Sequence, residues 1–179
     1  SYNTVADQLY EVPCNTIDQS LLTCAYICME YEGNRVELDE ILACSSWEGA
    51  FEKYTLGVGI NISGIDLSTA LYFLDRDIPF AACIDDGRYV LVISYNEAAV
   101  RYYDPILDEE VRVYRDEFEE SLSKQGNTMY TYTAQWWKIR QIKRRCEIIY
   151  NPTTLGRSAS KLYTHRLLLC VTLPRIHLV

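Results

Sequence analysis

Hydrophobic positions near the amino terminus repeat with the spacing of a buried helix face. The positions that share this face are Leu21, Cys24, Ile27, Cys28 and Tyr31. Their i, i+3, i+4, i+7 spacing predicts an amphipathic helix that follows Asp18 and ends at Gly33. Weaker helical patterns predict further helices over residues 38–44, 67–76 and 115–123, and a helical turn over 47–53. Asp66 and Ser68 are both suitable caps for the helix that begins at residue 67.

After Pro79 the hydrophobic pattern changes to the alternation of β-strands. Short β-rich stretches cover residues 80–84, 89–94, 99–103, 111–114 and 128–133, separated by turn sequences such as Asp85-Asp86-Gly87 and Asp104-Pro105. The last stretch, 128–133, is interpreted as an edge strand, and Gly57-Val58-Gly59 is interpreted as a loop. Helices that precede an antiparallel meander predict an α+β fold, with the amino-terminal helices packed on an antiparallel sheet.

Charge is distributed unevenly along the 179 residues. The net charge of −8 is the sum of −16 for residues 1–134 (8 basic, 24 acidic) and +8 for residues 135–179 (9 basic, 1 acidic). Such a reversal predicts two segments: a domain over 1–134 and a basic carboxy-terminal segment over 135–179 that is loosely packed or appended. The chain begins with Ser-Tyr, so we expect a processed chain or a piece of a longer protein.

Composition excludes several classes of function. The acidic body repels a phosphate backbone, so we expect no nucleic-acid partner for it. The longest apolar run, 167–173, is too short to span a membrane. The chain has seven cysteines without a CxxC pair and only two histidines, His165 and His177, so it shows no zinc-binding pattern. We therefore expect no metal and no cofactor.

Two stretches carry a resemblance to a known family. The first stretch is a helix sequence from Ser20 to Gly33, and it ends with Glu30-Tyr31-Glu32-Gly33. The second stretch is Gly87-Arg88-Tyr89-Val90-Leu91, followed by a hairpin and Asp104-Pro105. Their order and spacing resemble the papain-like cysteine peptidases that trim bacteriocin leader peptides, cysteine peptidase family 39. The resemblance covers about residues 10–133 and implies a bacterial, papain-like domain with an extracytoplasmic or cell-surface setting.

The catalytic positions implied by the resemblance are changed. Ser20 stands where the family has its nucleophilic Cys, and Arg88 stands where it has the general-base His; only Asp104 matches. The family's oxyanion-hole Gln lies about six residues before the nucleophile, where this chain has Cys14, and Gln19 is too close to Ser20 to replace it.

The chemistry of these side chains predicts an inactive site without reference to the family. A Ser or Cys nucleophile needs a neighbouring base, usually His, and residues 1–164 contain none. Arg88 is permanently protonated and cannot accept a proton. We therefore expect a peptidase-like pseudoenzyme that binds a peptide or protein segment, with Tyr89, Tyr102, Asp104, Cys14 and Gln19 as candidate binding residues.

Two alternatives remain open. The first is an active hydrolase that uses another thiol, Cys14, Cys24 or Cys44, activated by His165 or His177. The second is a structural domain of a larger cell-surface protein. A fast-reacting thiol at pH 6 would favour the first alternative.

Overall fold

The computed structural model describes residues 3–4 and 9–133 of the 179-residue chain. The chain divides into two compact units, Ser1–Lys138 and Ile139–Val179. The second unit and the whole basic segment predicted over residues 135–179 lie outside the described residues. Among the helices of the described part, none is long and apolar enough to cross a membrane.

The helices lie close to where the hydrophobic pattern predicts them. They are α1 (Ile17–Tyr31), α2 (Leu38–Leu42), α3 (Trp47–Tyr54), α4 (Leu67–Leu74) and α5 (Arg115–Lys124). Asp66 begins α4 by accepting a hydrogen bond from the amide of Thr69 at 2.7 Å. Gly33 (φ +76°) ends α1: its amide donates to the carbonyl of Glu30, and the amide of Asn34 donates to the carbonyl of Met29. The positive φ at this position explains why the helix ends at a glycine.

The strands form one antiparallel sheet. They are β1 (Asn3–Thr4), β2 (Val58–Asn61), β3 (Phe80–Cys83), β4 (Tyr89–Tyr95), β5 (Ala99–Asp104), β6 (Glu109–Tyr114) and β7 (Met129–Thr133). Their order is β2-β7-β3-β4-β5-β6, and β1 pairs with β4 beside this path. The predicted α+β architecture, helices packed on an antiparallel sheet, is confirmed.

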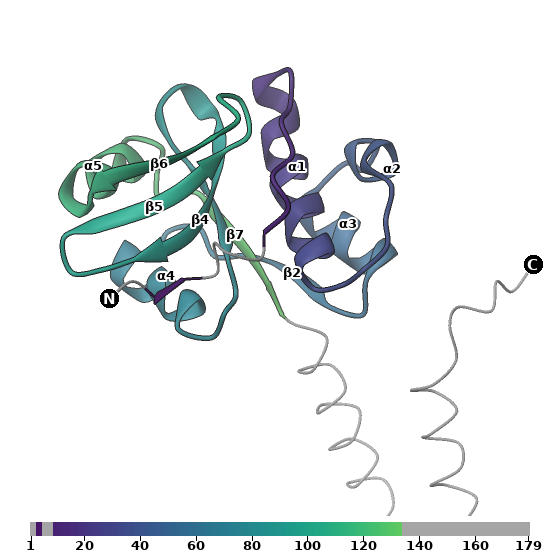
Figure 1. Ribbon diagram of the computed structural model, residues 1–179, viewed down its shortest axis with the longest axis horizontal. Coiled ribbons are helices and arrows are strands. Elements are labelled where there is room, and N and C mark those ends of the chain that lie inside the picture. Colours follow the sequence, from purple (N-terminus) through teal and green to yellow (C-terminus); the bar gives the residue numbers. More distant parts are fainter. Residues whose placement is uncertain (1–2, 5–8, 134–179) are drawn as a thin grey trace, which may run out of the picture. The chain divides into compact units, whose positions relative to one another are not determined.

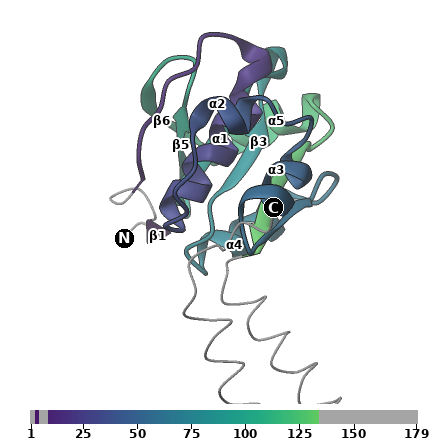
Figure 2. The same cartoon turned by 90° about the vertical axis from the view of Figure 1, so that its right-hand side faces the viewer.

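Helices cover both faces of the sheet (Figure 1). The helices α1, α2 and α3 lie on one face, and Figure 2 shows the strands behind them. The helices α4 and α5 lie on the opposite face. Side chains of β4 alternate between these layers: Leu91 and Ile93 pack in the α1 layer, Val90 and Val92 in the α4 layer. The sheet therefore separates two apolar cores that share its central strands.

Two sequence predictions about the strands were wrong. Residues 58–61 form β2 rather than a loop, and β7 lies between β2 and β3 rather than at an edge. Close packing explains the glycine in β2: a Cβ at Gly59 would lie 2.8 Å from Cδ1 of Trp47 and 2.9 Å from the Cα of Glu48. The glycine lets α3 approach the strand, and the Trp47 indole donates to the carbonyl of Thr131 on β7.

We predict that Gly59→Ala destabilises the domain by about 1–3 kcal/mol, because the added methyl group must displace Trp47 or the α3 backbone. Urea unfolding measures the change. Val58→Thr is the control, since it alters the neighbouring, half-exposed position of the same strand while keeping a β-branched side chain. Equal stability of Gly59→Ala and the parent chain would contradict the close contact.

The carboxyl end of α1 carries a half-buried acid. Glu32 accepts a hydrogen bond from the hydroxyl of buried Tyr132 at 3.0 Å. Burial raises the pKa of the Glu32 carboxyl above its usual value, and the Tyr132 hydrogen bond partly opposes this shift. Because its pKa is higher in the folded than in the unfolded chain, the favourable contribution of Glu32 is complete at acidic pH and is lost as the carboxyl ionises.

We predict that Glu32→Gln is more stable than the parent chain at pH 7, and that the difference disappears below about pH 4, where the parent Glu32 is neutral in both states. Glutamine keeps an oxygen that can accept from Tyr132. The measurement is the urea midpoint across this pH range, with Glu52→Gln, an exposed acid on α3, as the control. A variant less stable than its parent at pH 7 would contradict the expectation.

Candidate functional site

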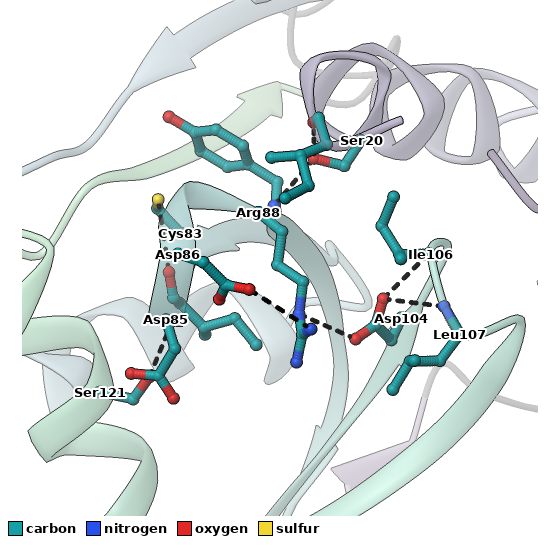
Figure 3. A network of polar contacts seen from close by, with 12 residues as sticks. Ser20, Cys83, Asp85, Asp86, Arg88, Asp104, Ile106, Leu107 and Ser121 are labelled. Carbon is teal, nitrogen blue, oxygen red and sulfur yellow. Dashed lines mark hydrogen bonds and ion pairs between the residues drawn. The ribbon is translucent and has the colours of Figure 1, made fainter. Parts of the chain in front are cut away.

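Ser20 lies in the first turn of α1 and is fully buried. Its hydroxyl donates to the carbonyl of Ile17 at 2.6 Å and accepts from the amide of Tyr89 at 2.9 Å. A serine hydroxyl has only one proton, and here that proton is committed to the backbone. Ser20 therefore joins the start of α1 to the start of β4 (Figure 3).

Arg88 lies directly before β4, after the short 3₁₀ turn η2 (Asp85–Gly87). Its side chain is 23% exposed and extends toward Asp104, with Nε 3.2 Å from Oδ2 of that carboxylate. A second acid, Asp86, lies 4.0 Å from Nη1 and is largely exposed. Asp86 has a positive φ of 61°, which the turn requires to redirect the chain into β4.

Asp104 is the last residue of β5, and its side chain has no exposed surface. Oδ1 accepts from the amides of Ile106 at 2.9 Å and Leu107 at 3.3 Å, which folds the chain into a turn. Oδ2 and the Arg88 Nε are both buried and make no hydrogen bond of good geometry. Since they lie 3.2 Å apart, their interaction is mainly the attraction of opposite charges. A buried carboxylate needs such a counter-ion.

Cys14 and Gln19 border this group from the amino-terminal side. The amide of Cys14 donates to the carbonyl of Pro105 at 2.8 Å, so the segment before α1 lies against the turn after Asp104. Burial raises the pKa of the half-buried Cys14 thiol, the Asp104 charge raises it further, and a hydrogen bond with Thr23 opposes both. Gln19 accepts from the Thr23 hydroxyl through its backbone carbonyl at 2.9 Å.

The two tyrosines predicted as binding residues lie on opposite faces of the sheet. Tyr89 packs against the α1 layer, and its ring centroid is 5.9 Å from that of Tyr130. Tyr102 is 6% exposed in the α4 layer and stacks on Phe118 with a centroid separation of 5.6 Å. The structure thus brings Ser20, Arg88, Asp104 and Cys14 into one region but does not bring the two tyrosine rings together.

Two exposed apolar residues beside the site were not predicted from the sequence. Ile17 is 41% exposed at the first position of α1, and Leu107 is 50% exposed in the turn that Asp104 holds. Exposure of single apolar residues has no sequence signal, because the same residues at a loop or helix start are as often buried.

The buried thiols are not activated. Cys24 and Cys28 are fully buried, and burial raises the pKa of each well above its usual value. Burial also raises the pKa of Cys83. These cysteines and Cys14 and Cys44 are unpaired thiols, and the described residues contain no cluster that could hold a metal ion. Elevated pKa values keep thiols protonated and weakly nucleophilic at neutral pH.

The fold of the chain is similar to known peptidase structures. A protein from Bacillus anthracis assigned as a C39-like peptidase superposes with a TM-score of 0.59 at 13% identity, over 73% of this chain and 96% of that chain. The chain has a C39-like, papain-like fold. A double glycine motif protease from an AMS/PCAT transporter, solved in complex with its leader peptide, superposes with a TM-score of 0.54 at 13% identity, over 69% of this chain and 90% of that chain.

Sequence comparison alone does not detect this likeness: no protein-family model and no curated protein matches the chain. The papain-like fold of the chain is therefore established by its structure.

We predict an asymmetric response when the Arg88–Asp104 ion pair is broken. Arg88→Met leaves a fully buried carboxylate without a counter-ion and is expected to cost about 3 kcal/mol. Asp104→Asn keeps an oxygen for the Ile106 and Leu107 amides and leaves a partly exposed guanidinium, so it is expected to cost about 1 kcal/mol. The double variant should be more stable than Arg88→Met alone.

Urea unfolding of the three variants gives the coupling energy. Asp86→Asn is the control and should change stability by less than about 0.5 kcal/mol, because its contact with Arg88 is long and exposed. An Arg88→Met variant as stable as Asp104→Asn would show that the carboxylate does not depend on Arg88.

Proposed function

We propose that this papain-like domain is catalytically silent and binds a peptide or protein segment on the surface around Ser20, Arg88 and Asp104. The proposal rests first on the Ser20 hydroxyl, which is fully buried and hydrogen-bonded to two backbone groups. A nucleophile must present a free lone pair to a carbonyl carbon and give up its proton to a base. Ser20 meets neither requirement in this environment.

The second support is the ion pair at the position of the base. A general base must accept a proton near neutral pH, and a guanidinium paired with a buried carboxylate does not do so. The raised pKa values of Cys14, Cys24 and Cys83 speak against these three thiols as the nucleophile. Peptide binding, by contrast, requires only surface shape and charge.

The third support concerns the occupant of the surface. Ile17 and Leu107 offer exposed apolar side chains at the start of α1 and in the turn after β5. The hydrogen bond from the Cys14 amide to the Pro105 carbonyl holds the segment before α1 against that turn. One structural neighbour was solved with a leader peptide bound. By analogy with that protein, we propose that this chain binds a peptide but does not cleave it.

We predict that the unmodified chain cleaves no peptide, and that Ser20→Cys together with Arg88→His creates a reactive thiol. In the double variant we expect the imidazole to reach both the new thiol and Asp104, so that it removes the thiol proton while Asp104 orients it. Either change alone should be nearly silent, because nucleophile and base act as a unit. The readout is alkylation of the introduced thiol by iodoacetamide at pH 6, located by peptide mass mapping.

Peptide cleavage by the parent chain would overturn the catalytic part of the proposal. Such cleavage would instead favour a hydrolase that uses another thiol, and the same mass mapping of the parent would identify a single fast-reacting cysteine.

Peptide binding is tested with a random-peptide display library panned on the full chain, followed by fluorescence anisotropy of the enriched peptides. We expect Leu107→Gln to weaken binding about tenfold or more, since it removes an exposed apolar contact at the site. Leu56→Gln is the matched control, because Leu56 is 56% exposed and lies next to β2, at the other edge of the sheet from β5 and β6. Absence of any enriched peptide, or equal loss in both variants, would contradict binding at this surface.

A further inference from the structure

Three exposed acids belong to the chain segments that form the site: Asp18, Asp86 and Glu109. We call them the acidic rim. Asp18 precedes Ser20 by two residues in the first turn of α1. Asp86 lies 4.0 Å from the Arg88 guanidinium, and Glu109 is the β6 partner of Asp104 in the β5–β6 ladder. The acidic rim therefore follows the same three chain segments that form the site.

The charges of this region do not balance. Arg88 is the cation of the central ion pair, and Asp104 already compensates it at 3.2 Å. One guanidinium against Asp104 and the three rim carboxylates leaves +1 − 4 = −3 when all are ionised. Opposite charges attract over about 8–10 Å at ordinary ionic strength, so the rim favours a cationic ligand and disfavours an anionic one.

Apolar contacts lie within the same border. Ile17 immediately precedes Asp18, and Leu107 lies two residues before Glu109. A ligand that covers either exposed apolar side chain therefore also approaches a rim carboxylate. The 1–134 domain of a second copy fits poorly as the occupant, because it carries a net charge of −16 and two such domains repel each other.

We infer that the segment bound at this site carries lysine or arginine side chains next to apolar ones. The inference rests on the proposed peptide-binding function and specifies its ligand: an extended basic-apolar peptide whose apolar residues contact Ile17 and Leu107 while its cationic groups pair with Asp18, Asp86 and Glu109. An acidic peptide of the same apolar content would face the rim charges without compensation.

The test uses three fluorescein-labelled peptides of about 12 residues, long enough to cross the site when extended. They share the same leucine and valine positions and carry lysine, glutamine or glutamate at the others. Fluorescence anisotropy with the full chain at low salt should show the lysine peptide binding at least about tenfold tighter than the glutamine peptide and the glutamate peptide weakest. Raising the salt concentration should reduce the differences in affinity between the three peptides.

Two matched triple variants separate the rim from the overall charge of the chain. Asp18→Asn/Asp86→Asn/Glu109→Gln neutralises the rim, and Asn also tolerates the positive φ at position 86. Asp39→Asn/Glu40→Gln/Glu52→Gln removes the same number of exposed acids from α2 and α3. Only the rim variant should bind the lysine peptide more weakly than the parent chain does, by about tenfold. Both triple variants should unfold at the temperature of the parent chain.

Each outcome decides the inference. Preferential binding of the lysine peptide that depends on the rim supports it. Binding of all three peptides with equal affinity, preference for the glutamate peptide, or equal loss in both triple variants overturns the charge preference while leaving peptide binding intact. If none of the three peptides binds, the inference fails; the display selection then decides separately whether the proposed function fails with it.

Discussion

Burial of β4 on both faces is the constraint on which the rest of the domain depends. Its odd-numbered side chains Leu91 and Ile93 belong to the α1 core, and Val90 and Val92 belong to the α4 core. A strand in this position cannot shift by one residue without exchanging every side chain between the two layers. The start of β4 is therefore fixed in space, and the amide of Tyr89 holds the Ser20 hydroxyl against it. The candidate site is a direct consequence, because Ser20 and Arg88 are placed by this one strand end.

The same constraint explains why an arginine is structurally acceptable at position 88, the position that we propose to correspond to the catalytic base of papain-like peptidases. Asp104 is fully buried at the end of the neighbouring strand, and its turn needs the carboxylate oxygen that accepts from Ile106 and Leu107. A cation at position 88 compensates the remaining oxygen, and a guanidinium does so at every pH. The ion pair thus maintains the local structure while removing the proton acceptor. A side chain at position 88 can therefore stabilise the turn after Asp104 without being able to accept a proton.

Periodicity explains how much of the fold could be predicted from sequence. The helix of residues 17–31 and the strands between residues 80 and 114 have strong helical or alternating patterns, and their positions agree with the structure to within a few residues. The pattern around Gly57-Val58-Gly59 carries no such signal, because its glycines are needed for the approach of Trp47 and of β7 rather than for strand propensity. Without β2, the neighbouring β7 could only be interpreted as an edge.

The candidate site was less accessible to sequence reasoning than the fold. The resemblance to family 39 peptidases singled out Ser20, Arg88 and Asp104 as candidate residues. The face on which a strand residue lies, however, depends on pairing register, which the sequence does not specify. Tyr102 pairs with Val92 and therefore belongs to the α4 layer, whereas Tyr89 has the parity of Leu91 and belongs to the α1 layer. The exposure of Ile17 and Leu107 likewise depends on how the segment around Cys14 lies against the turn after Asp104. These are tertiary relations between segments far apart in the chain.

The internal contacts of Ser20 differ from those that a catalytic nucleophile requires. A catalytic side chain at position 20 must remain exposed and keep a proton acceptor nearby, which leaves polar groups incompletely satisfied. Ser20 instead satisfies both the Ile17 carbonyl and the Tyr89 amide, and it has no exposed surface. Ser20, Arg88 and Asp104 therefore hold α1, β4 and β5 together. The proposed recognition therefore depends on the surface that these elements present, with its exposed apolar side chains and its excess of negative charge.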